Sequence, residues 1–366
     1  MTDAELRGFW HRSGLLAVSA LFAVAAANEG CGGDNPAQTT STTTTTSTTT
    51  TTTTTGSGGG GGTGGTGGTM DADMSAAAED VFFPLDATPG PDGDTIYFTA
   101  LDPTKGAGVY KAGPAGGAST VVRAGDPYAS PFGIAIGSDG TKLYVADVGA
   151  GADPMNDAVL DSGQIFVQAA TGGDPTVLAG TAGTKPRGLE VVDEKGADQV
   201  YFTGRDAKGD FGVFKIPAAG GSPTAVSVGA PFVDPSGVAI ADKGDVYVAD
   251  AAPGAKLGAI IYKITAGDKV AKEFVTLGDV GYPVGVALDA ANSKLLISAL
   301  DASARTDQVV IVDLATGTQS IFIGDADTDI SKFHEPAGLH RAKNKDIFAW
   351  SDSTAGKAGT VFKINF

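Results

Sequence analysis

The chain has very few residues of the two types that most often build reactive or metal-binding centres. It contains one cysteine, Cys31, and three histidines, at positions 11, 334 and 340, among 366 residues. A single cysteine excludes an intrachain disulfide and a multi-cysteine metal site. Because His11 precedes an apolar N-terminal run, two histidines remain, too few for a zinc site with three histidine ligands.

Basic residues are also scarce relative to acidic ones. The sequence has 25 Lys and Arg against 42 Asp and Glu, which gives a net charge of −17 and a pI of about 4.4. Such a surface repels nucleic-acid phosphates and anionic lipid headgroups. We therefore expect no nucleic-acid partner and no electrostatic membrane binding, whereas divalent cations or basic partners suit the charge.

Two familiar catalytic motifs are absent from the sequence. There is no Gly-x-Ser-x-Gly nucleophile elbow and no His-Glu-x-x-His. The glycine-rich tract at 56–68 is not followed by Lys-Ser or Lys-Thr, so it is no phosphate-binding loop. No catalytic site is recognised, and a binding function is expected before an enzymatic one.

The N-terminus predicts export. The apolar run Leu15–Ala27 is roughly 13 residues long, whereas a membrane-spanning helix needs about 20, so a signal peptide is indicated. Cys31 follows Gly30 shortly after this run, and the segment resembles a bacterial lipoprotein signal, which implies lipidation of Cys31. A cell-envelope lipoprotein, at the outer membrane or cell surface, is expected; cleavage after the alanine cluster, giving a periplasmic or secreted protein, and an uncleaved anchor are the alternatives.

Two low-complexity tracts follow the signal. Thr39–Thr55 is almost entirely threonine, and 56–69 is almost entirely glycine. Neither can bury apolar surface, so both predict a flexible stalk. The expected organisation is a signal peptide over 1–31, a disordered linker over 32–77 and one folded domain over 78–366.

An internal repeat fills the remainder of the chain. A Pro-x-Gly motif followed by apolar residues recurs about every 50 residues. Its copies begin at Pro131, Pro186, Pro235, Pro283 and Pro336, with a degenerate first copy at Pro84. Each is followed by two further β-branched or aromatic segments and a weaker fourth, bounded by Gly, Pro, Asp or Asn. Six such units predict an all-β, six-bladed β-propeller with four-stranded antiparallel blades.

The two ends of the repeat region predict how the ring closes. The sixth unit stops after its third strand, at Phe366, and an unassigned segment, Asp80–Phe83, precedes the first unit. We expect this segment to supply the outer strand of the last blade, which protects two strand edges.

The amino-acid sequence of the repeat resembles that of NHL-repeat and SMP-30/gluconolactonase-like propellers over roughly residues 80–366. Pro235–Ile240 with Asp245–Asp250 carries the likeness best. For the SMP-30 group the resemblance implies a metal-dependent hydrolase or lactonase, with Ca²⁺ or another divalent cation held by oxygen ligands. Ligands are expected there just before the inner glycines, but these positions hold Phe132, Arg187, Ser236, Val284 and Ala337. Asp234 and Glu335 are the remaining metal-ligand candidates.

The centre of the ring has its own candidates. Two residues after the inner glycine, three units carry alanine, whereas units three and six carry Glu190 and His340. Units three and six lie opposite each other in a six-fold ring, so these side chains, with Arg187 and Arg341 beside them, could form a polar channel cluster. The pair could perform general acid–base work, or could simply be a salt-bridged channel lining.

Acidic residues mark one rim of the expected ring. An aspartate follows the second strand of every unit, at Asp102, Asp147, Asp206, Asp250, Asp301 and Asp352. These residues predict either an acidic mouth or turn-closing side chains that accept backbone N–H groups. Two acidic loops, 153–161 and 325–329, are either calcium-binding or solvated.

The sequence favours a monomeric, non-catalytic propeller that binds a small molecule or protein at its channel mouth. Glu190, His340, His334 and Glu335 are the expected contact residues, together with Arg187 and Arg341. A metal-dependent hydrolase or lactonase is the alternative. An antibiotic-inactivating propeller lyase also resembles this repeat, but the shortage of histidine counts against it.

Overall fold

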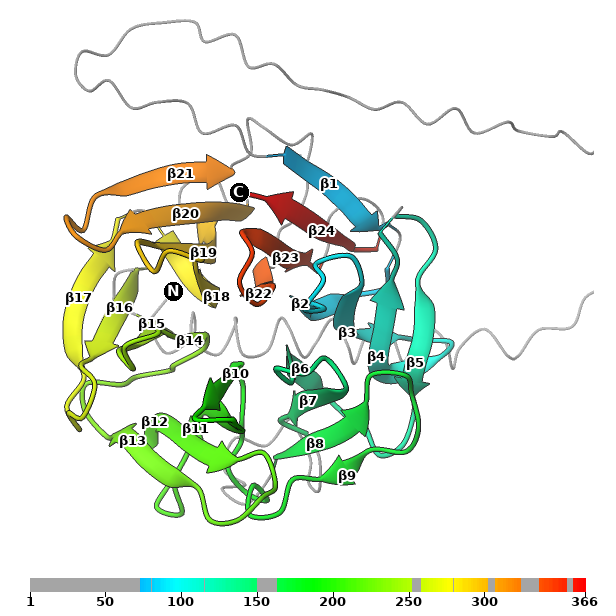
Figure 1. Ribbon diagram of the computed structural model, residues 1–366, viewed down its shortest axis with the longest axis horizontal. Helices are drawn as coiled ribbons and strands as arrows, with labels where there is room; N and C mark the ends of the chain where they lie inside the picture. Colours follow the sequence, from blue (N-terminus) through cyan, green and yellow to red (C-terminus); the bar gives the residue numbers. More distant parts are fainter. Residues whose placement is uncertain are drawn as a thin grey trace, which may run out of the picture.

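The computed structural model describes residues 73–79, 81–114, 116–149, 163–251, 258–278, 280–301, 307–323, 336–353 and 358–366. All regular structure in these ranges is β-strand. No helix in them is long and apolar enough to cross a membrane. The strands form six sheets of four antiparallel strands each, arranged radially around a centre (Figure 1). The prediction of a six-bladed β-propeller is confirmed.

Each blade runs from the centre outward in chain order, except that the outermost strand of blade 6 is β1. Blades 1 to 3 consist of β2 (Pro84–Pro89), β3 (Ile96–Asp102), β4 (Gly106–Ala112) and β5 (Thr120–Ala124); β6 (Pro131–Ile136), β7 (Lys142–Asp147), β8 (Gln164–Ala169) and β9 (Thr176–Val177); and β10 (Leu189–Glu194), β11 (Ala197–Arg205), β12 (Phe211–Pro217) and β13 (Thr224–Val228).

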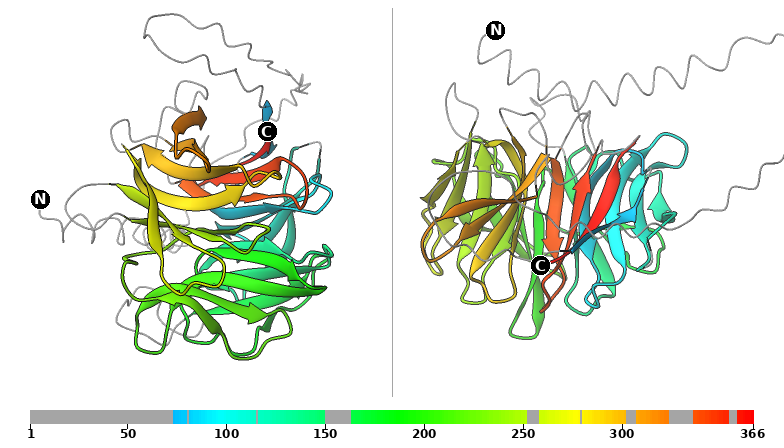
Figure 2. Two further views of the ribbon diagram at one scale, coloured as in Figure 1. Left: turned by 60° about the vertical axis from the view of Figure 1, so that its left-hand side comes forward. Right: turned by 90° about the horizontal axis from the view of Figure 1, so that it is seen from above.

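The other three blades follow the same plan around the ring. Blades 4 to 6 consist of β14 (Val238–Ile240), β15 (Val246–Ala251), β16 (Ala259–Ile264) and β17 (Lys272–Leu277); β18 (Val280–Leu288), β19 (Lys294–Asp301), β20 (Asp307–Asp313) and β21 (Gln319–Ile323); and β22 (Pro336–Arg341), β23 (Ile347–Asp352), β24 (Thr360–Asn365) and β1 (Asp73–Ala78). Seen from the side, the blades stand next to one another in a disc (Figure 2).

The hydrophobic core is divided among the blade interfaces. Successive side chains of a strand point to opposite faces of its sheet, and in a propeller both faces meet a neighbouring blade. In β7, Leu143 and Val145 pack against blade 1, whereas Tyr144 and Ala146 pack against blade 3. This two-sided burial explains why the middle strands are continuously hydrophobic instead of alternating.

The ring closes at the expected blade but through a different segment. β1 pairs antiparallel with β24, from Asp73 opposite Asn365 to Ala78 opposite Val361. The closing strand is therefore Asp73–Ala78, which lies in the predicted linker except for its last residue, and not 80–83. An outer strand is half-exposed and needs little hydrophobic pattern, so the more apolar 80–83 was the wrong choice. Val81 and Phe83 still donate backbone hydrogen bonds to Gly359 and Ala358 as the chain turns into β2.

The inner glycines let neighbouring blades approach closely at the centre. A Cβ on Gly133 would lie 2.0 Å from the Arg187 carbonyl oxygen of the next blade, and one on Gly188 would lie 2.2 Å from that of Ser236. Real Cβ atoms do not come so close to backbone. The glycine of the Pro-x-Gly motif is therefore required by the close backbone-to-backbone packing of neighbouring blades around the channel.

Candidate functional site

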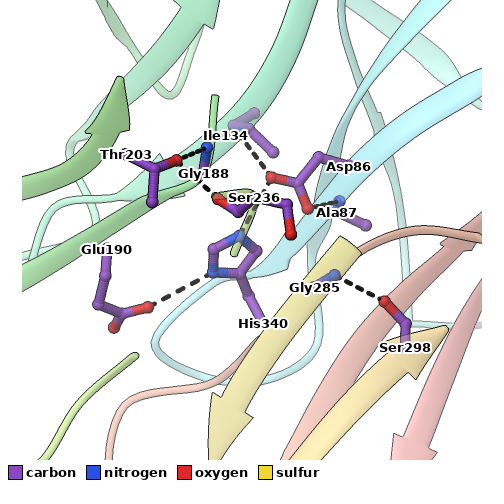
Figure 3. Close-up of polar contacts among 10 residues, drawn as sticks. All are labelled: Asp86, Ala87, Ile134, Gly188, Glu190, Thr203, Ser236, Gly285, Ser298 and His340. Carbon is purple, nitrogen blue, oxygen red and sulfur yellow. Dashed lines mark hydrogen bonds and ion pairs between the residues drawn. The ribbon is translucent and has the colours of Figure 1, made fainter. Parts of the chain in front are cut away.

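Three charged side chains from three blades meet at the centre of the ring. Nε2 of His340 on β22 lies 3.1 Å from Oδ2 of Asp86 on β2, and Nδ1 of the same ring lies 3.5 Å from Oε2 of Glu190 on β10. Figure 3 shows the imidazole between the two carboxylates. We call Asp86, Glu190 and His340 the channel cluster. The expectation that Glu190 and His340 face each other across the ring agrees with this geometry.

Asp86 stands where the other blades have their inner glycine. It pairs with Thr99 on the second strand of blade 1, as Gly133 pairs with Ala146 in blade 2. Its carboxylate accepts backbone N–H groups from Ala87 through Oδ1 and from Ile134 of blade 2 through Oδ2, both at 2.8 Å. One buried side chain therefore contacts blades 1, 2 and 6.

Gly338 makes room for this carboxylate. A Cβ at position 338 would lie 1.6 Å from Oδ1 of Asp86. The glycine of blade 6 and the aspartate of blade 1 are thus complementary. Any larger residue at 338 would displace the carboxylate to which His340 is hydrogen-bonded.

The surroundings of His340 hold it in the charged form. Its side chain is almost completely buried, and burial alone would lower its pKa. The negative charges of Asp86 and Glu190 outweigh this effect and raise the pKa of His340 to about 10. The imidazolium donates from Nε2 to Asp86 and forms an ion pair through Nδ1 with Glu190. A histidine that stays protonated at neutral pH is a poor general base, so the acid–base interpretation is disfavoured.

Hydroxyl groups support the inner strands around the cluster. Gly188 N–H donates to Oγ1 of Thr203 at 2.9 Å, and the same hydroxyl donates to the Ser236 carbonyl of blade 4 at 2.6 Å. In blade 5, Gly285 N–H donates to Oγ of Ser298 (Figure 3). These bonds fix the glycine segments and so the positions of the residues that follow them, Glu190 among them.

The two arginines expected beside the cluster have other partners. Nη1 of Arg187 lies 2.5 Å from Oδ1 of Asp234. This ion pair links blade 3 to the segment that precedes β14, the inner strand of blade 4. Nη1 of Arg341 donates to the carbonyls of Ala342 and Lys345 in the turn after β22. Arg341 follows His340 directly in a strand, so the two side chains point to opposite faces. Arg341 therefore does not join the channel cluster.

The aspartates at the strand ends close turns. Asp147 accepts the N–H groups of Ala129 and Ser130, and Asp250 accepts those of Val233 and Asp234. Both carboxylates are fully buried. Asp102 and Asp206 likewise accept N–H groups within their own hairpins. The turn-closing interpretation fits these four residues, and an exposed acidic mouth does not.

Several expected residues lie outside the described residues. They are Cys31, His334, Glu335 and the acidic loops at 153–161 and 325–329. Within the described ranges, no group of three or more His, Cys, Asp or Glu side chains is arranged to hold a metal ion. Asp234, a metal-ligand candidate, is instead paired with Arg187.

Asp86 is the member of the site that sequence reasoning missed. The signal was present: five units have glycine after Pro-x, and the first has aspartate in Pro84–Ala87. When the first copy is interpreted as degenerate, this departure carries no signal. A charged residue in a position that otherwise requires glycine indicates a functional site more strongly than the two acidic stretches of the sequence do.

Comparisons with known proteins show the same architecture. No protein-family model matches the chain, and no curated protein matches its sequence. A solved structure proposed to be a gluconolactonase superposes with a TM-score of 0.56 at 14% identity, covering 81% of this chain and 92% of the other. A gluconolactonase from Xanthomonas campestris gives 0.55 at 16%, covering 81% and 89%. The soluble aldose sugar dehydrogenase of Escherichia coli gives 0.54 at 11%, covering 80% and 99%. At such identities the likeness shows the fold.

Proposed function

We propose that this propeller is a ligand-binding module whose binding site is the central channel, and that it performs no catalysis. The observation that carries the proposal is the convergence of Asp86, Glu190 and His340 from three blades. Two of them are buried, whereas the Glu190 side chain remains 31% exposed. A charged side chain that is held in place by buried partners and is itself partly exposed to solvent is suited to ligand binding.

A metal-dependent lactonase is the competing function, and the fold is compatible with it. That activity requires several oxygen ligands around one ion. Among the described residues no such group exists. The negative charge of Glu190 also disfavours the carboxylate that lactone hydrolysis produces. These points favour binding over hydrolysis.

A paired screen tests the binding proposal. Thermal-shift screening of a metabolite library against the wild-type chain and Glu190→Gln should find compounds that stabilise only the wild type. Glu273→Gln, a charge-matched change on the exposed outer strand β17, should behave like the wild type. If every stabilising compound acts equally on all three proteins, the channel is not the binding site.

Enzyme assays decide the alternative. Glucono-1,5-lactone should be hydrolysed no faster with the protein than without it, in the presence of Ca²⁺, Mn²⁺ or Zn²⁺. Those ions should leave the melting temperature unchanged. Metal-dependent hydrolysis that disappears in Glu190→Gln would establish the lactonase and end the non-catalytic proposal.

We also propose that the protein is exported and lipidated at Cys31. The support is the apolar run Leu15–Ala27 followed by a lone cysteine and a Thr/Gly-rich stalk. In a bacterial host, metabolic labelling with an alkyne fatty acid should mark the wild type and not Cys31→Ser. Equal labelling of both proteins, or labelling of neither, would contradict lipidation.

A further inference from the structure

Within the channel cluster, Glu190 alone has a free acceptor facing the channel. Both oxygens of Asp86 accept backbone N–H groups, and Oδ2 also accepts from His340. Both ring nitrogens of His340 face carboxylates. Oε2 of Glu190 faces His340, whereas its Oε1 has no hydrogen-bond partner among the described residues. That oxygen is what the cluster presents to a ligand.

The charge at this position is negative. With His340 protonated, the cluster carries one positive and two negative charges, and the donors that could attract an anion are occupied. Arg187, which lies two residues before β10, is paired with Asp234. The whole chain carries a net charge of −17, so the field around the ring adds to the same preference.

From these observations we infer that the channel takes a ligand through an ammonium group, which donates to Glu190. This inference rests on the proposed ligand-binding role of the channel and specifies its ligand class. An ammonium group supplies up to three donors and one positive charge, which balances the excess carboxylate. Charge-assisted hydrogen bonds of this kind are stronger than neutral ones, and partial burial reduces screening by solvent. Within the channel cluster, both ring nitrogens of His340 already face carboxylates, so the cluster offers an anionic ligand no open side-chain donor.

Three probes of the same length separate charge from shape: butylammonium chloride, sodium butyrate and butan-1-ol. Each is titrated into the full-length chain at constant ionic strength, and the imidazole NMR signals of His340 are followed together with the melting temperature. Butylammonium should shift the His340 signals saturably and raise the melting temperature, whereas butyrate and butanol should not. In Glu190→Gln the apparent affinity for butylammonium should fall about tenfold or more.

The control is Glu273→Gln, which removes the same charge from the outer strand β17 and should bind butylammonium like the wild type. If butyrate or butanol shifts the His340 signals as much as butylammonium does, the ammonium assignment is overturned while a channel binding site stands. If no probe shifts them, the ammonium assignment is likewise wrong. The metabolite screen then decides the binding proposal independently.

Discussion

Asp86 serves as acceptor for three donors at once, so its removal has a large expected cost. In Asp86→Ala, the Ile134 N–H loses its acceptor and the buried His340 loses its closest counter-charge. Breaking a buried charged pair by removing one partner typically costs about 3–5 kcal/mol. Urea unfolding of the purified variant should show a loss of stability in this range.

A double-mutant cycle separates the ion pair from the other contacts of Asp86. Asp86→Ala together with His340→Ala removes both charges, so the double variant should lose clearly less stability than the sum of the two single variants. Simple additivity would contradict the pairing of these residues. The cycle also reports directly on a contact between residues 254 positions apart in the chain.

His340 gives the stability of the domain a defined pH dependence. Its pKa is raised from 6.5 in the unfolded chain to about 10 in the folded protein. A raised folded-state pKa contributes stability that is fully present below pH 6.5 and is lost as the pH rises through about 10. The difference in melting temperature between the wild type and His340→Gln should therefore shrink between pH 7 and pH 11. A constant difference over that interval would show that His340 is not held as an imidazolium.

At the scale of the strands, the inner glycines are the most sensitive positions. Gly133→Ala and Gly188→Ala would each place a Cβ at about 2 Å from the backbone of the next blade. Overpacking of this kind costs about 1–3 kcal/mol, and more where backbone must move. Chemical denaturation should show the loss in each variant.

Gly113→Ala is the matched control for these substitutions. Nothing lies within 4 Å of a Cβ at that position, so the variant should be as stable as the wild type or slightly more stable. Equal effects at 113 and 133 would mean that the loss reflects backbone flexibility and not contact between blades.

Much of the architecture could be predicted from the strands, whereas the site could be predicted only in part. The Pro-x-Gly motif and four β-segments per unit predicted the blades, because every blade packs against its neighbours in the same way and so repeats the same sequence pattern. Glu190 and His340 followed from the same argument, since equivalent positions in opposite blades face each other. Asp86 was missed because its role depends on ring closure, which brings β2 beside β22. Arg341 lies outside the channel cluster, and strand alternation alone places it on the face opposite His340.

At the scale of the whole molecule, the ring depends on one strand from the N-terminal side. β1 makes the outermost strand of blade 6, and its last residues, Ala77 and Ala78, are buried between blades 6 and 1 with Val361 and Ala349. The sequence placed this strand too late because Asp73–Ala78 has small and polar residues, which carry little β-propensity. Its position is set by tertiary pairing with β24.

Two truncations test this dependence. Deletion of residues 1–72 keeps β1 and should leave the melting temperature of the domain unchanged. Deletion of 1–79 removes the strand, its ladder with β24 and its buried alanines. At about 1 kcal/mol per hydrogen bond, the second variant should lose several kcal/mol of stability. It should also self-associate in size-exclusion chromatography, because β24 becomes an exposed sheet edge. Equal melting temperatures for the two truncations would mean that the ring is held by the blade interfaces alone, without the contribution of β1.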